Sequence, residues 1–232
     1  MPKPAARKRP VAKSADRSLR KRRGIGRPPA GQHAVGRDAL IARTCQMLTF
    51  MPPNRITRAE VARHMNVDPS LIRYYFRDRS TLLLAAAEKL TTDFIDILEE
   101  EQAQTDPSPA GRLRARVSTQ LKLNVTYPFF HRLLIDELLT LDSPAARRFL
   151  DELTSRAVSS YGAILEAGLK EGVFRRSSGA FLFLAVIGMC EFFVNGMPIL
   201  RIALGKDFDE RAIGARYREF ICELLLNGVK AR

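Results

Sequence analysis

The residues best suited to specific chemistry lie between positions 56 and 76, in a segment with the pattern of two short helices. Thr57 opens the first helix, where a hydroxyl and the unpaired N–H groups of a helix N-terminus can bind a phosphate. On the second helix, Arg73 can donate two hydrogen bonds to O6 and N7 of guanine, and Leu71 can lie against the methyl group of thymine. These residue types at this spacing favour recognition of double-stranded DNA through its major groove.

The local signals around these residues predict a steep crossing of the two helices. Thr57 and Glu60 form a capping box for the first helix, and Asp68-Pro69 supplies an N-cap and a first-turn proline for the second. Between them, Asn66 tolerates the left-handed backbone that such a turn needs. The side chains expected to pack between the helices are Val61, Ala62, Val67, Ile72 and Phe76. Those left to enter a groove are Pro69, Ser70, Leu71, Arg73 and Tyr74.

From Arg37 to about Leu90 the chain resembles the DNA-binding domain of the tetracycline-repressor (TetR) family of bacterial regulators. The matching residues are Ile56-Thr57, Val61-Ala62, Val67, Ile72, Tyr75-Phe76, Arg79 and Leu82-Leu83. The resemblance implies base contacts by Pro69, Ser70, Leu71 and Arg73, and phosphate contacts by Thr57, Arg58, Tyr75 and Arg79. For Tyr74 and Tyr75, packing of one ring against the first helix is an equally weighted alternative.

The chain departs from the family pattern in four places, one of which is Pro52-Pro53, near a position that is commonly glycine. Asn66 replaces the usual turn glycine, Arg73 stands where tyrosine is general, and Arg79 stands where lysine is general. These changes bear on the operator sequence more than on the fold. The resemblance implies an all-α fold of about nine helices. A three-helix helix-turn-helix domain would span residues 31–81, and an effector-binding and dimerisation bundle would span residues 82–232.

The net charge of +13 is concentrated at one end of the chain. Residues 1–30 hold eleven Lys and Arg against one Asp, a net charge of +10, whereas residues 81–232 carry a net charge of −1. Clustered cations favour a polyanionic partner because they neutralise phosphates and release counterions. We expect residues 1–30 to be a disordered basic arm. Its Gly26-Arg27-Pro28 resembles the core of AT-hook peptides, so Arg27 could enter an A·T minor groove; a nonspecific phosphate-binding tail is an equal alternative.

Composition also points to a cytoplasmic protein with no membrane partner, and the resemblance implies that it is bacterial and nucleoid-associated. The three cysteines are far apart and form no C-x-x-C pair, which fits a reducing compartment. The basic N-terminus is not followed by the apolar run of a signal peptide. The longest apolar run, residues 180–190, is shorter than the roughly twenty residues needed to cross a bilayer. We therefore predict a helix buried by protein on most sides.

Caps and breakers predict six helices after the DNA-reading unit. Their expected extents are Ser80 to Leu98, Ser108-Pro109 to Tyr127, Phe129 to Leu141, Ser143-Pro144 to Gly172, Ser178 to Gly205, and Asp209 to about Leu226, closed by Asn227-Gly228. Polar or aromatic residues on the middle helices that could face an effector cavity are Asn124, Tyr127, Phe130, His131 and Glu137. Residues that could line an apolar cavity are Met189, Phe192 and Met197. For any single one of these, a place in the core or on the surface is the commoner outcome.

Three classes of protein could account for these features: an enzyme, an architectural DNA-binding protein and a ligand-responsive repressor. No nucleophile elbow, P-loop, dinucleotide fingerprint or zinc-protease motif is present, and His131 has no second His or Cys at ligand spacing, so we expect no enzyme, metal or cofactor. A basic architectural DNA-binding protein without an effector would explain the arm but not the neutral body. A homodimeric repressor that binds a near-palindromic operator explains the helix-turn-helix, the charge gradient and the neutral body together. Its release would be caused by an unknown small molecule, with an apolar compound among the candidates. The sequence leaves open the effector, the operator, the target genes and the choice between repression and activation.

Overall fold

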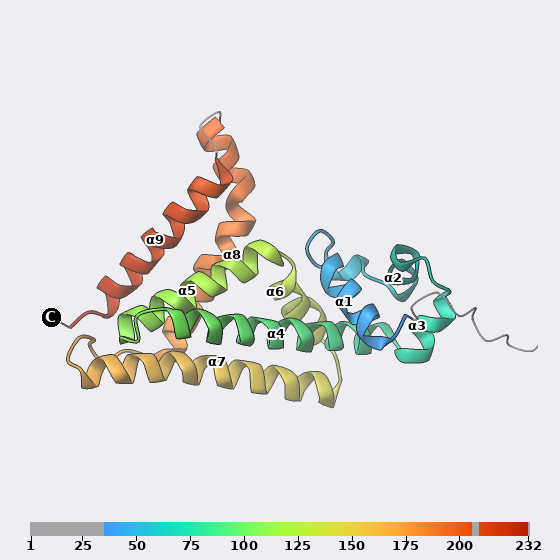
Figure 1. Ribbon diagram of the computed structural model, residues 1–232, viewed down its shortest axis with the longest axis horizontal. Helices are drawn as coiled ribbons and strands as arrows, with labels where there is room; N and C mark the ends of the chain where they lie inside the picture. The colour runs from blue at the N-terminus through green and yellow to red at the C-terminus, as the bar shows by residue number, and fades with distance from the viewer. Residues whose placement is uncertain (1–34, 206–208, 232) are drawn as a thin grey trace, which may run out of the picture. The chain divides into compact units, whose positions relative to one another are not determined.

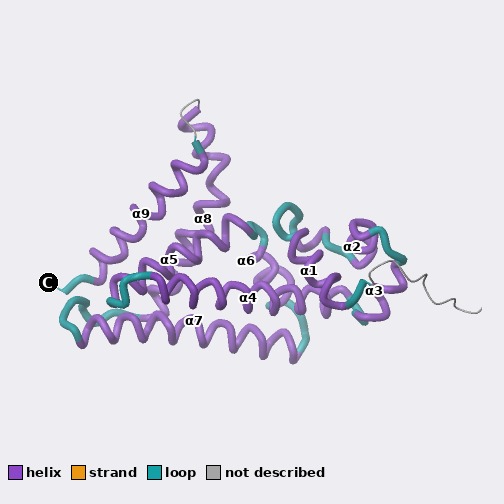
Figure 2. Tube along the Cα trace, viewed as in Figure 1, coloured by secondary structure: helices purple, strands orange, loops and turns teal. Residues whose placement is uncertain are grey.

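Helices make up the regular structure of the chain in the computed structural model, which describes residues 35–205 and 209–231 (Figure 1). Within these ranges the β-pairing is limited to one bridge between Phe174 and Lys230 (Figure 2). The elements in chain order are α1 (Arg37–Met47), a 3-10 turn (Pro53–Arg55), α2 (Arg58–Met65), α3 (Pro69–Tyr75), α4 (Arg79–Gln104), α5 (Pro109–Thr126), α6 (Phe130–Arg132), a π-helix (Leu133–Leu138), α7 (Pro144–Lys170), α8 (Gly179–Leu204) and α9 (Glu210–Val229). The predicted all-α fold is confirmed.

Most helix starts follow the predicted caps. Ser108, Ser143 and Ser178 accept hydrogen bonds from backbone N–H groups in the first turns of α5, α7 and α8. The start of α4 was predicted wrongly. Its N-cap is Asp78, whose carboxylate accepts from the Thr81 N–H at 2.8 Å, whereas Ser80 lies inside the helix. A carboxylate is an equally good N-cap and also complements the helix dipole, which explains the shift.

The N-terminal helices pack around side chains that are fully buried. Leu40 and Leu48 come from the α1 region, Phe76 ends α3, and Leu82 opens the apolar face of α4. The Cys45 thiol donates to the Ala86 carbonyl at 3.6 Å, which ties α1 to the first half of α4. Because α4 packs against both α1 and α5, the boundary predicted after residue 81 falls inside a helix shared by the two parts.

A second core joins α5, α7, α8 and α9. Gly172 has φ +72° and follows the C-cap of α7, as predicted, because glycine adopts this left-handed conformation without a Cβ clash. The resulting reversal brings the ring of Phe174 onto Gly168, where a Cβ would lie only 2.0 Å from the ring. Across the bundle, Phe193 of α8 and Tyr217 of α9 stack with ring centroids 4.4 Å apart.

The cysteines are part of these cores. Cys45, Cys190 and Cys222 are all buried and unpaired. Burial raises the pKa of Cys45 and Cys190 to about 12, so both remain protonated thiols at neutral pH. The prediction that these are inert core residues is consistent with this environment.

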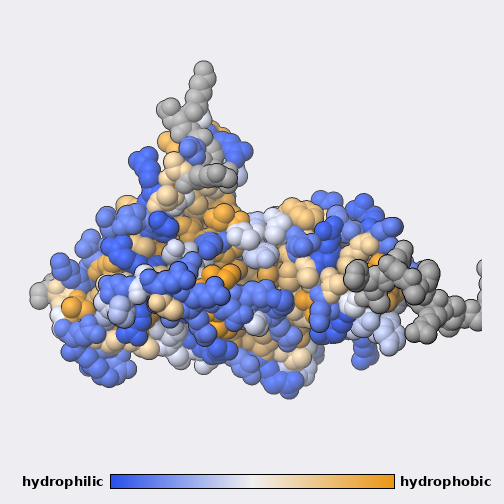
Figure 3. Space-filling view, viewed as in Figure 1, coloured by the Kyte–Doolittle hydropathy of each residue, from blue (hydrophilic) through white to orange (hydrophobic). Residues whose placement is uncertain are grey.

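Helix α8 has the predicted extent, from the N-cap Ser178 to the C-cap Gly205, but it is more exposed than the sequence predicted. It extends for 26 residues, and its most apolar 18-residue window has a mean hydropathy of 1.9, which is long and apolar enough to cross a membrane by length and composition alone. Within the chain, only 28% of its most apolar stretch is buried. Figure 3 shows the apolar surface that this leaves along α8. The prediction of a helix buried by its own chain on most sides is therefore wrong, and the length of the uninterrupted apolar run underestimated the apolar stretch because Glu191 and Asn195 interrupt it only singly.

The last helix also ends later than predicted. Asn227-Gly228 does not close α9, which continues to Val229. The carbonyl of Val229 accepts a hydrogen bond from the Arg175 N–H at 2.8 Å, and the carbonyl of Gly228 accepts from the Arg175 guanidinium. These contacts to the loop after α7 stabilise the extra turn.

Candidate DNA-binding surface and internal cavity

The two helices of the predicted DNA-reading unit cross through a sharp turn. Asn66 has φ 52° and ψ 46°, the left-handed conformation expected there. The Thr57 side chain accepts from the Glu60 N–H at 3.1 Å, and the Asp68 side chain accepts from the Ser70 N–H at 2.7 Å. Val61 and Ile72 are buried between α2 and α3, so the packing predicted for this unit is confirmed.

One face of α3 points to solvent. Pro69, Ser70, Arg73 and Tyr74 are exposed, and their spacing places them on the same side of the helix. Tyr74 is 81% exposed and meets the half-buried Tyr75 edge to face, with ring centroids 5.0 Å apart. Leu71 is half-buried at the margin of this face. We call this face, with Leu71, the α3 face.

Arg58 lies beneath the end of α3. Its guanidinium donates to the carbonyls of Phe76 and Arg77 at 3.3 and 2.6 Å. The side chain is half-buried and holds the connection between α3 and α4. In this conformation it positions the α3 face rather than extending from it.

Arg79 has a different environment from the one predicted. Its guanidinium forms a bidentate ion pair with Glu137, at 2.6 and 2.8 Å, and donates to the carbonyls of Ile56 and Pro53. Glu137 lies in the π-helix, so this pair joins the start of α4 to the body of the protein. With its donors engaged inside the protein, Arg79 is not displayed as a phosphate contact.

Two other arginines occupy exposed positions beside the α3 face. Arg55 is exposed two residues before the N-cap Thr57, and Arg77 is exposed immediately after α3. Neither was predicted from the sequence, although each is adjacent in the chain to a residue of the predicted DNA-reading unit, Ile56 or Phe76. Arg27 and the basic arm lie outside the described residues.

A cavity of about 420 Å³ lies inside the body. Most of its walls are apolar and come from α4, α5, α7, α8 and the α6–π-helix segment. Three of the predicted effector residues line it: Asn124, Phe130 and His131. The Gln120 amide donates to Asn124 at 2.7 Å, and Nδ1 of His131 contacts the Glu191 carboxylate. Burial lowers the pKa of His131, which favours the neutral ring.

The other predicted residues do not line this cavity. Tyr127 lines a separate pocket of about 410 Å³ between α4 and α5, and Glu137 pairs with Arg79. On α8 the cavity wall consists of a helical stripe, Phe183, Leu184, Ile187, Gly188 and Glu191. Met189 and Phe192 are displaced from this stripe by one residue. Met189 therefore packs toward α9 and Phe192 is 69% exposed. Met197 packs against the bundle core.

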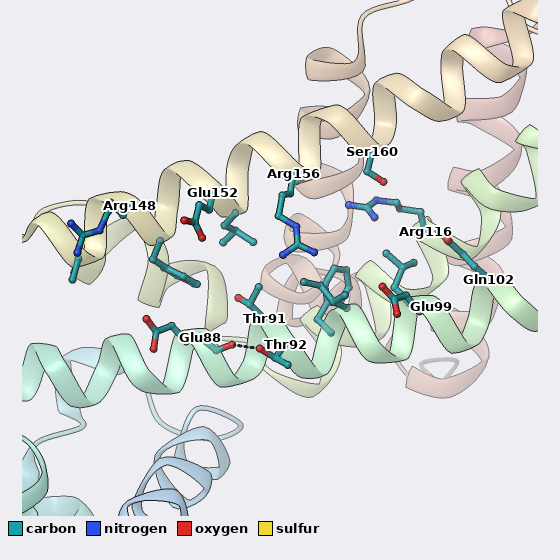
Figure 4. Close-up of a pocket in the computed structure, with 17 residues that line it drawn as sticks. Glu88, Thr91, Thr92, Glu99, Gln102, Arg116, Arg148, Glu152, Arg156 and Ser160 are labelled. Carbon is teal, nitrogen blue, oxygen red and sulfur yellow. Dashed lines mark hydrogen bonds between the residues drawn. The ribbon is translucent and has the colours of Figure 1, made fainter.

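A second, more polar cavity of about 560 Å³ adjoins the first between α4 and α7 (Figure 4). The two share part of their walls, including Phe94 and Arg116. In Figure 4, Arg116 from α5 and Arg156 from α7 both point into this space. Among the described residues, no group of three or more His, Cys, Asp or Glu is placed to hold a metal ion.

The chain is similar to known proteins over both the part with the α3 face and the part with the cavity. Residues 106–232, more than half of the chain, match the family model described as the tetracyclin repressor-like C-terminal domain. The HTH-type transcriptional regulator BetI of Paraburkholderia phymatum is 24% identical over 200 residues, covering 86% of this chain and 97% of BetI. The HTH-type transcriptional repressor NicS of Pseudomonas putida is 27% identical over 172 residues, covering 69% of this chain and 76% of NicS.

Solved structures show the same fold. A putative transcriptional regulator from Saccharomonospora viridis in complex with choline superposes with a TM-score of 0.66 at 16% identity, covering 84% of this chain and 98% of that one. The helix-turn-helix geometry, the cavity-bearing bundle and the family match agree. The chain therefore belongs to the tetracycline repressor-like (TetR) family of DNA-binding transcriptional regulators.

Proposed function

We propose that this protein is a cytoplasmic, nucleoid-associated homodimeric repressor that binds a near-palindromic operator and is released by a small molecule in the 420 Å³ cavity. The observation that carries the proposal is the α3 face, four exposed side chains on a short helix held at a steep crossing by a left-handed Asn66. A recognition helix of this kind places its exposed residues against base edges in the major groove.

The exposed α3 face reads bases. Arg73 donates to guanine, and Pro69, Ser70, Leu71 and Tyr74 supply hydroxyl and apolar contacts. The Thr57 hydroxyl and the N-terminus of α2 bind a phosphate, with Arg55 and Arg77 in place of Arg79 and with Tyr75 at the edge. Residues 1–30, which carry a net charge of +10, add affinity for flanking DNA, with Arg27 as the minor-groove contact.

A second copy of the chain covers the exposed face of α8 and α9. Large apolar side chains on this face are Phe181, Phe192, Ile199, Ile202, Phe220 and Leu224. The opposite side of α8 packs into the bundle core through Leu182, Val186, Cys190 and Phe193. A helix apolar on both sides is satisfied when one side meets its own core and the other meets a partner. Dimerisation accounts for the apolar face without a membrane and pairs two α3 faces for a palindrome.

The π-helix links the cavity to the DNA-binding helices. Leu134 and Ile135 line the cavity, while Glu137, in the same segment, holds Arg79 at the start of α4. A ligand that displaces this segment also displaces Glu137, and with it the carbonyl contacts of Arg79 beneath α2. Because the two α3 faces of a dimer must match grooves about 34–36 Å apart, a small tilt of α4 weakens operator binding.

Binding measured by fluorescence anisotropy tests the function. Operators are selected from random DNA by the full-length protein, and the enriched sites are titrated at physiological salt with excess nonspecific competitor. We expect a palindromic consensus and a preference of roughly 10³-fold or more over random DNA. A basic architectural protein would show no such preference, and that result would reject the regulator proposal.

A further inference from the structure

The two cavities in the body meet at one charged side chain. Arg116 of α5 lines both the apolar cavity and the polar one that adjoins it (Figure 4). It is only 8% exposed, whereas Arg148 and Arg156, the other arginines of the polar cavity, are exposed to solvent. Arg116 is thus a buried cation at the junction of an apolar space and a wetter one.

This cation has no counter-ion among the described residues. No carboxylate lies within the 4.0 Å of an ion pair, and its Nε is buried without a hydrogen-bond partner. Its guanidinium lies over the ring of Tyr161, 4.7 Å from the centroid. Burial raises the pKa of Tyr161 to about 12, so the phenol is neutral at physiological pH and cannot balance the charge.

The other ionisable groups around the two cavities do not neutralise Arg116. In the apolar cavity, Glu191 contacts His131. In the polar cavity, Glu88, Glu99 and Glu152 are exposed, and water solvates them better than a buried guanidinium can. Arg116 is therefore a buried cation on the wall of the apolar cavity that no carboxylate of the described residues contacts as an ion pair.

We propose that Arg116 is an anion-recognition residue and that the effector is an apolar carboxylate, whose chain or ring fills the 420 Å³ cavity while its carboxylate pairs with Arg116. A guanidinium binds a carboxylate through two parallel hydrogen bonds, which are strong where water is excluded. The volume lies within the usual range of about 300–1,000 Å³ for small-molecule sites. A quaternary ammonium such as choline has the wrong charge, and the Tyr161 face that could receive it is covered by Arg116.

The inference rests on the proposed effector function but is tested without DNA. The probes are decanoate and 2-naphthoate, each compared with its uncharged alcohol, 1-decanol and 2-naphthalenemethanol, and decyltrimethylammonium as a cation of matched chain length. Binding to the full-length protein is measured by calorimetry and by the rise in Tm that a ligand of the native state causes. We expect at least one carboxylate to bind about tenfold or more tightly than its alcohol, equivalent to ~1.4 kcal/mol, and the ammonium to bind no better than the alcohols.

Substitution of Arg116 separates recognition from a structural role. Arg116→Met keeps the length of the side chain and removes its charge. We expect this variant to lose the preference for carboxylate over alcohol while its ligand-free Tm stays equal or rises, because an unpaired buried charge has been removed. Arg116→Lys restores part of the preference. The matched control, Arg147→Met on α7, removes an exposed arginine that lines neither cavity and leaves the preference unchanged.

The assignment would be overturned if neither carboxylate bound more tightly than its alcohol, or if the ammonium bound more tightly than the alcohols. It would also be overturned by an Arg116→Met variant that keeps the preference for carboxylate over alcohol, or that is less stable than the unsubstituted protein without ligand. Operator binding is measured in parallel, because it separates this inference from the proposed function. A protein that binds its operator but prefers no carboxylate retains the regulatory function and loses only the effector class.

Discussion

Arg73 and Arg79 show how two arginines in one short stretch take different roles. Arg73 is exposed on the α3 face, whereas Arg79 is bound to Glu137 and to the carbonyls of Ile56 and Pro53. The difference depends on Glu137, 58 residues further along the chain, and no local pattern could reveal that contact. Residue type alone therefore predicts a capacity for DNA contact, and the surrounding contacts decide which arginine uses it.

Replacement of Arg73 should change specificity. We expect Arg73→Ala to cost ~1–3 kcal/mol of operator binding and to relax the preference at one base pair in each half-site. The reason is that a bidentate contact to guanine distinguishes it from the other bases. Titrations against operators with every single-base change provide the measurement, and Arg147→Ala on the exposed side of α7 serves as control. A uniform loss on all operators would assign Arg73 to the phosphate backbone instead.

Arg77 and Arg79 form a matched pair for testing the phosphate contacts. Arg77→Ala removes an exposed charge next to the α3 face, so we expect the slope of log affinity against log salt to fall by about one per protomer. Arg79→Ala should leave that slope unchanged and lower the free energy of unfolding by about 1–3 kcal/mol, because Glu137 and two carbonyls lose their donors. The reverse pattern would restore Arg79 as the phosphate contact.

At the scale of elements, the sequence patterns that predicted helix starts and turns correctly were those confined to a few neighbouring residues. The caps at Thr57, Asp68, Ser108 and Ser143 and the left-handed residues of the turns all act within four positions of the chain. The signals that failed depend on distant contacts. The π-helix at Leu133–Leu138 had no local signature. Met189 and Phe192 were wrongly assigned to the cavity because the sequence does not show how α8 is rotated about its own axis. Packing against other helices sets that rotation.

The turn between α2 and α3 is the element most open to direct test. Asn66 adopts φ 52°, a conformation that costs a β-branched residue about 1–2 kcal/mol. We therefore expect Asn66→Val to lower the free energy of unfolding by that amount and to weaken operator binding, and Asn66→Gly to retain both. Chemical denaturation and anisotropy provide the two readouts. Equal stability of the Val and Gly variants would show that the turn does not constrain the crossing of the helices.

At the scale of the whole molecule, two features of the single chain are incomplete without a partner. One is the apolar face of α8 and α9, where large side chains such as Phe192 and Ile202 are 69% and 84% exposed. The other is the α3 face, since one short helix contacts too few base pairs to specify a site in a genome. A two-fold dimer completes both at once, because it buries one copy's apolar face against the other and duplicates the reading helix. The cavity wall includes residues of α8, which carries the apolar face, and residues of the π-helix, whose Glu137 holds Arg79 at the DNA-binding helices. A ligand in the cavity therefore contacts the elements behind both surfaces, which suits the cavity to regulation.

A charge introduced at Phe192 tests whether the apolar face of α8 and α9 is the dimer interface. Its ring is 69% exposed on α8 and lies off the stripe that lines the cavity, so a charge at this position disturbs a partner more than a ligand. We expect the full-length protein to sediment at twice the 26.1 kDa of one chain. Phe192→Glu should shift it to the monomer, because two like charges would be buried at an isologous contact.

The control is Val125→Glu, which puts the same charge on an exposed apolar residue of α5 outside this face and should leave the dimer intact. The Phe192→Glu monomer should retain its helical content by circular dichroism and lose operator affinity by about tenfold or more, since the two α3 faces no longer bind as one unit. Sedimentation velocity and anisotropy on the same samples measure both properties. A Phe192→Glu protein that remains a dimer would place the interface elsewhere. A monomer with full operator affinity would contradict the proposal that the two α3 faces of a dimer bind the two half-sites of the operator together.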